Sequence, residues 1–257
     1  MDDDAPRSAA VLAEMHQLKS RSRRLAHGGA WLPALVLAAV PLGSIALYRH
    51  PFSAALNSAQ AQSEEGVTFD YPYWAGLPEQ QHNALLSYAF WLVAVALAVV
   101  LVARWYRHRE DSRGVRVPWR MPLVAGGTGL LALLALFAAP TGTPPSSGLD
   151  FAWWQGLLTP LISIALAVIA LGFAERSVGI AAAGLWLGGL AWQFCATGYV
   201  GGLLGWQSWL LSGGSGPALG GQLGLGLDRP AIALVVMALP LVLVGLYRAF
   251  RLRGQLT

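Results

Sequence analysis

The stretch ALLSYAFWLVAVALAVVLVARW occupies residues 84–105, and its only charged residue is Arg104, next to its end. An α-helix needs about 20 apolar residues to cross the hydrocarbon core of a bilayer. We therefore predict that this stretch is a membrane-spanning helix. Further apolar runs of similar length lie on both sides of it, at residues 29–48, 121–139, 151–173, 178–200 and 230–247.

The composition supports the same class of protein. The 257 residues are 55% hydrophobic and 12% charged, with a mean hydropathy of +0.51, which is too apolar for an ordinary soluble domain. We expect an all-α polytopic membrane protein with six transmembrane helices. Residues 1–28 would precede the spans, residues 29–248 would contain them, and residues 249–257 would form a tail.

The basic residues divide unequally between the segments that join these runs. Fifteen of the seventeen lie before the first run, from the end of the second run (Arg104) to the start of the third, between the fourth and fifth, or after the sixth, and only Arg49 and Arg229 lie elsewhere. Cytoplasmic segments carry the excess of Lys and Arg, so both termini are predicted to be cytoplasmic. These charges sit at span ends, which favours contact with anionic lipids over nucleic acid. The Ala-, Gly- and Leu-rich composition with a single lysine is typical of a GC-rich bacterium, and thus of its plasma membrane.

Residues 7–25 have the pattern of an amphipathic helix. Val11, Met15, Leu18 and Leu25 recur at helical spacing on one face, and basic residues occupy the rest. Such a helix would lie along the inner leaflet, with its arginines among the lipid headgroups. This helix could serve to anchor the first span, or it could be a docking site for a partner.

Two segments on the outer side have unusual compositions. Residues 50–83 have no lysine or arginine, and their second half contains a stretch dense in aromatic residues and prolines at residues 69–78. This composition predicts an ordered cap on the outer surface, with a ligand-binding site as the alternative. Residues 201–228 are rich in glycine and carry Asp228 as their only charge. This composition fits a re-entrant segment, and equally a loosely packed surface loop.

The middle of each predicted span has no Asp, Glu, Lys, Arg or His. Proton-coupled carriers usually need such a group, so an autonomous ion-coupled transporter is disfavoured. A phosphate-binding loop needs a lysine after its glycines, and the only lysine, Lys19, lies in the amphipathic segment. We therefore expect no enzymatic activity, and a helical body without any buried ionisable group. His50 and His82 end neighbouring spans, where a metal site and ordinary interfacial histidines both fit.

Gly184 and Gly188 have the four-residue spacing that lets two membrane helices approach closely. Residues 104–120 are predicted to form a short cytoplasmic loop between the second and third spans. This loop carries a run of charges. These charges could be solvated and only set the membrane topology, or they could form a surface that binds a partner.

The layout resembles the permease subunit of type-2 ATP-binding-cassette exporters. That family has an amphipathic helix before six spans, a coupling segment between spans two and three, and re-entrant structure before the last span. The resemblance implies a separate nucleotide-binding ATPase subunit that holds ATP and Mg, a homodimer or heterodimer of permeases, and an apolar or amphipathic substrate. It also implies that the coupling segment contacts the ATPase, through Arg107, Arg109, Arg113 and Arg116.

Two other classes of function stay open. The chain could be a non-transporting structural or regulatory subunit of a larger membrane complex. It could also be an enzyme that acts on lipid, for which Asp70, Glu79 and His82 are the candidate polar cluster on the outer side.

Overall fold

The computed structural model describes residues 14–15, 29–52, 76–77, 81–113, 157, 159–197 and 229–253. Within these ranges the chain is helical and contains no named strand; Tyr48 and Gln81 form an isolated antiparallel bridge. The named elements are α2 (Trp31–Gly43), the 3-10 helix η1 (Ser44–Leu47), α4 (Ala84–Arg113), α6 (Pro160–Ala174), α7 (Val178–Thr197) and α9 (Pro230–Arg253).

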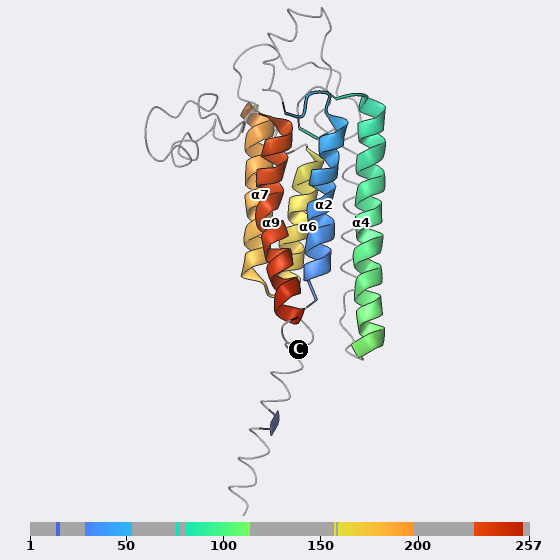
Figure 1. The fold of residues 1–257 in the computed structure, drawn as a ribbon, viewed down its shortest axis with the longest axis vertical. Coiled ribbons are helices and arrows are strands. Elements are labelled where there is room, and N and C mark those ends of the chain that lie inside the picture. The colour runs from blue at the N-terminus through green and yellow to red at the C-terminus, as the bar shows by residue number, and fades with distance from the viewer. Residues whose placement is uncertain are drawn as a thin grey trace, which may run out of the picture.

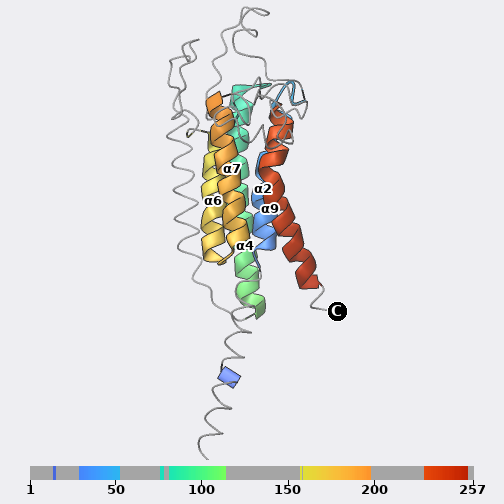
Figure 2. The ribbon, with the colours of Figure 1, turned by 90° about the vertical axis from the view of Figure 1, so that its left-hand side faces the viewer.

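These helices lie side by side along one axis (Figure 1). α6 packs against α7 and α2 packs against α9, contacts between α7 and α9 join the two pairs, and α4 contacts α2 (Figure 2). Where α2 begins, α4 and α9 end and α6 turns into α7; we call this the Glu175 end. We call the opposite end, where η1 leads into Tyr48, the Tyr48 end.

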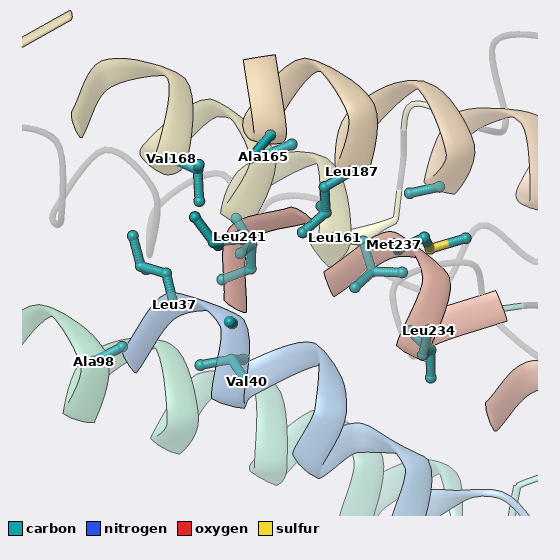
Figure 3. Close-up of a cluster of buried hydrophobic side chains, with 14 of the residues drawn as sticks. Leu37, Val40, Ala98, Leu161, Ala165, Val168, Leu187, Leu234, Met237 and Leu241 are labelled. Carbon is teal, nitrogen blue, oxygen red and sulfur yellow. The ribbon is translucent and has the colours of Figure 1, made fainter. Parts of the chain in front are cut away.

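The centre of the bundle is apolar and closely packed. Leu241 of α9 lies between Leu37 of α2 and the side chains of α6 and α7, and all of these are buried (Figure 3). Large apolar side chains on the outer surface, such as Leu97 of α4 and Leu243 of α9, are exposed. An apolar surface around an apolar core is what a helix bundle in lipid requires.

α4, α7 and α9 are long and apolar enough to span a membrane, while α6 and the α2–η1 segment are shorter apolar helices. The chain thus has the helices expected of a membrane protein. Its described basic residues also gather at the two ends as their sequence positions require. From the bounds of the helices, Arg49 and Arg229 lie at the Tyr48 end, and the other described basic residues lie towards the Glu175 end.

Two helix boundaries differ from the prediction. α6 begins at Pro160 rather than near residue 151, because the Thr159 hydroxyl accepts from the N–H of Leu161 as an N-cap and proline favours the first helical position. α4 continues to Arg113, so the predicted loop over residues 104–120 is wrong over its first ten residues. Arginine and glutamate are good helix formers, and no Gly or Pro occurs between Ala84 and Gly114.

A proline inside α9 leaves a backbone carbonyl that accepts a hydrogen bond from another helix. Pro240 has no N–H, so the carbonyl of Val236, one turn earlier, loses its usual intrahelical donor. The indole Nε1 of Trp186 on α7 donates to this carbonyl at 2.9 Å. The bond joins α7 to α9 at a point where the backbone of α9 would otherwise be unpaired.

Several predicted features lie outside the described residues. They are the third span, the segment 201–228, most of the outer segment 50–83, and the amphipathic helix 7–25 apart from Glu14 and Met15, which are helical and exposed.

Candidate functional site

The turn between α6 and α7 places a carboxylate inside the bundle. The N–H of Ser177 donates to the carbonyl of Gly172 and the N–H of Arg176 donates to that of Phe173, which is the Schellman ending of a helix. Arg176 is in the left-handed conformation, with φ 49°, where glycine is usual. The Ser177 hydroxyl then caps α7 by accepting from the N–H of Ile180. The turn is short, and it turns Glu175 inward, with 2% of the residue exposed.

α4 supplies two partners for this carboxylate. The Tyr106 hydroxyl donates to Glu175 Oε1 at 2.7 Å, and Arg109 Nη1 lies 3.9 Å from the same oxygen. Tyr106 and Arg109 are three residues apart, so they share one helix face, and both are buried. We call Tyr106, Arg109 and Glu175 the ionic cluster. It joins α4 to the α6–α7 turn, although these elements are separated by more than 60 residues in the chain.

The beginning of α2 is held against the same part of α4. Trp105 Nε1 donates to the carbonyl of Gly29 at 2.9 Å, and the ring of Trp105 meets that of Trp31 edge-on at 5.4 Å. A Cβ at Gly29 would overlap the guanidinium of Arg109, so glycine makes this close approach possible. The last turns of α4 therefore contact both the beginning of α2 and the α6–α7 turn through side-chain hydrogen bonds and charges.

Glu175 is poorly solvated as an anion. Its Oε2 has no hydrogen-bond partner within the described part of the chain, and Arg109 is too distant for a hydrogen bond to Oε1. Burial raises the pKa of Glu175; the Tyr106 hydrogen bond and the charges of Arg109 and Arg248 oppose this increase only in part. The expectation of a body without buried ionisable groups is thus wrong: Glu175 and Arg109 are both buried, near the end of the bundle rather than in the middle of a span.

The residues predicted to contact a partner have different environments. Arg107 is exposed on α4, whereas Arg109 is 8% exposed and faces the bundle. Arg113 is the last residue of α4, and Arg116 lies outside the described residues. The exposed side chains beside Arg107 follow at helical spacing and form one polar stripe, Arg104, Arg107, His108 and Asp111. Within that stretch of α4, the cluster and the stripe thus occupy different faces.

Gly184 and Gly188 lie where α7 meets α6. A Cβ at Gly184 would be 2.8 Å from Ile169 Cγ1 and 2.9 Å from the Ile169 nitrogen, and one at Gly188 would be 3.0 Å from Ala165 Cβ. On the α6 side, a Cβ at Gly172 would be 2.5 Å from the Ala181 nitrogen. Small residues from both helices therefore set this interhelical distance.

A second set of buried polar contacts, without charged residues, lies at the Tyr48 end. The N–H of Leu77 donates to the Tyr48 hydroxyl at 2.8 Å, and the Thr159 hydroxyl donates to the carbonyl of Gly76 at 3.0 Å. Gly76 has φ +123°, which favours glycine, and Leu77 is 1% exposed. Residues 76–77 thus enter the bundle and help to close this end.

Metal ligands do not gather at either end in the described ranges. His50 and His82 are exposed near the Tyr48 end, and no group of three or more His, Cys, Asp or Glu residues with metal-binding geometry occurs among the described residues. Asp70 and Glu79 lie outside those ranges. Cys195, the only cysteine, is buried in α7.

No protein-family model, curated protein or solved structure matches this chain.

Proposed function

We propose that this chain is the membrane-spanning subunit of a transporter complex, driven by a separate ATPase subunit, and that it moves an apolar or amphipathic substrate. The composition and the lengths of the described helices support this proposal. The described core is apolar, three of the described helices are long enough to cross a bilayer, and most of the described basic residues lie at the Glu175 end. Such a body offers a hydrophobic path but needs a source of energy from another chain.

The observation that carries the proposal is the unbroken length of α4. Thirty helical residues extend about 45 Å, whereas the hydrocarbon core of a bilayer is about 30 Å thick. The last turns of α4 therefore extend past the apolar layer, and in Figure 1 they also extend past the ends of α6 and α7. A partner bound to the polar stripe of α4 would act on a rigid element.

The ionic cluster gives that element a defined connection to the rest of the bundle. Tyr106 and Arg109 lie on the inner face of the same turns whose outer face carries Arg104 and Arg107. Displacement of the α4 end would thus be transmitted to Glu175 and to the α6–α7 turn. Coupling between distant sites needs such a chain of rigid, packed elements, and a partner that interacts differently with two arrangements of them.

The test is purification of the chain from its native membrane, followed by measurement of ATP hydrolysis. We expect an ATPase subunit to copurify in a fixed ratio and to hydrolyse ATP several-fold faster with the chain than without it. Arg104→Ala with Arg107→Ala should weaken this stimulation several-fold, because exposed interface charges mainly steer association. Arg229→Ala is the matched control, since it removes an exposed arginine from the opposite end.

Two results would contradict the proposal. One is an ATPase response that stays unchanged when both stripe arginines are removed. The other is copurification in a fixed ratio with a membrane complex that contains no ATPase, which would favour the structural or regulatory subunit instead.

A further inference from the structure

The surroundings of Glu175 favour a carboxyl group that carries a proton. An ionised carboxylate has two oxygens that accept hydrogen bonds, and burial is costly unless donors surround both of them. Within the described residues, Tyr106 gives Oε1 its hydrogen bond, Arg109 contributes charge from 3.9 Å, and Oε2 has no hydrogen-bond partner. A protonated, neutral carboxyl group at this position would cost less to bury than an ionised one and would need fewer hydrogen-bond donors around it.

We propose that Glu175 is a proton-binding site, and that a proton bound there stabilises the packing of the α4 end against the α6–α7 turn. The inference concerns this chain alone and holds whether or not a separate ATPase binds to it. The proton has a short path from water, because Arg176, the next residue, is exposed at the same turn.

The charged and titratable groups that face Glu175 come from two helices. α4 contributes Tyr106 and Arg109, and α9 contributes the charge of Arg248. The start of α2 contributes the backbone of Gly29, which lies against the Arg109 guanidinium. Burial raises the pKa of the Glu175 carboxyl, and the Tyr106 hydrogen bond and the two arginines lower it by less. The hydrogen-bond geometry and the direction of the pKa shift therefore both favour the protonated form of Glu175.

The direction of the linkage follows from that shift. A carboxyl whose pKa is raised by burial binds its proton more tightly in the closed arrangement than in an opened, hydrated one. Proton binding therefore favours the closed arrangement, and loss of the proton favours separation of the α4 end from the turn. Between the ordinary pKa of a glutamic acid and the raised one, the folded chain binds more protons than the unfolded chain. The free energy of unfolding must then fall as the pH rises through this interval.

Infrared spectroscopy of the purified chain in lipid nanodiscs tests the site directly. The C=O stretch of a protonated, buried carboxyl should be present at the ordinary pKa of a glutamic acid and should disappear as the pH rises, with a midpoint above that ordinary value. Glu175→Gln should lack this transition. Glu110→Gln, the same chemical change on α4 outside the cluster, should keep it.

A conservative variant tests the geometry. Tyr106→Phe removes the hydrogen bond that favours the ionised form and leaves the ring, so the midpoint should rise by about one pH unit. The thermal midpoint of the wild type, followed by tryptophan fluorescence, should fall over the same pH interval and should be flat in Glu175→Gln. Identical infrared titrations of the wild type and Glu175→Gln would overturn the inference. A midpoint that stays constant or falls in Tyr106→Phe would also overturn it.

Discussion

Replacing Gly184 with alanine should separate α6 from α7, and a neighbouring glycine provides the control. The added Cβ would lie 2.8 Å from Ile169 Cγ1, 2.9 Å from the Ile169 nitrogen and 3.1 Å from the Ala165 oxygen. Carbon atoms in favourable contact are about 3.5–4.0 Å apart. Two of these neighbours are backbone atoms, so a change of the Ile169 rotamer cannot relieve the overlap and the helices must move apart. Overpacking of this kind costs about 1–3 kcal/mol.

Gly189→Ala makes the same chemical change five residues later, where the new Cβ would have no neighbour within 4 Å. Both variants gain about 1 kcal/mol of helix propensity, so the difference between them isolates the packing cost. We expect Gly184→Ala to be less stable than Gly189→Ala by about 1–3 kcal/mol, or roughly 3–10 °C in thermal midpoint for a chain of this size. Gly172→Ala, whose Cβ would meet backbone atoms of Ala181, should lose at least as much.

The chain supplies its own probe for this measurement. Cys195 is the only cysteine and is buried in α7, so a thiol-reactive fluorescent dye added during heating reports when the bundle opens. Equal midpoints for Gly184→Ala and Gly189→Ala would refute the argument that the glycine sets the interhelical distance. A higher midpoint for Gly184→Ala would refute it more strongly.

Two further substitutions test individual features of the fold with the same assay. Arg176→Gly should raise the stability by about 1 kcal/mol, because glycine accepts the left-handed conformation of this turn without the steric cost that arginine carries; an unchanged or lower midpoint would contradict this. Trp186→Phe should lower the stability by about 0.5–2 kcal/mol, because the Val236 carbonyl loses the donor that replaces the missing N–H of Pro240; a midpoint equal to that of the wild type would show that this bond contributes nothing.

Hydropathy predicted the described helices well because burial in lipid depends mainly on composition. α7 begins at Val178 and α9 at Pro230, as the apolar runs indicate. Helix ends depend on local chemistry instead. The signals that correct them were present in the sequence: Thr159 before Pro160 marks a helix start, and the absence of Gly or Pro between Ala84 and Gly114 allows α4 to continue. Six spans and cytoplasmic termini stay predictions.

The ionic cluster was harder to predict, because it depends on which side of each element faces the bundle. Tyr106 and Arg109 lie in a run of charges that hydropathy assigns to water, and nothing local distinguishes Arg109 from the exposed Arg107. Position on the helix supplies the missing information. Val95, Ala98, Val102 and Tyr106 recur every three or four residues and are all buried, and Arg109 is the next position on that face.

The α6–α7 turn combines two costs that a turn chosen only for stability would avoid. Arg176 occupies a conformation that glycine adopts more easily, and Glu175 is a buried carboxyl with one oxygen unpartnered among the described residues. A buried ionic group is weak evidence for stability, because apolar residues of similar volume are often as stable or more stable. Such costs in one place are characteristic of functional positions. The two can be separated by experiment: Arg176→Gly should stabilise the chain and leave the Glu175 infrared transition in place, whereas Glu175→Gln should abolish that transition. If Arg176→Gly also abolished it, the strained turn itself would be what positions the carboxyl group for proton binding.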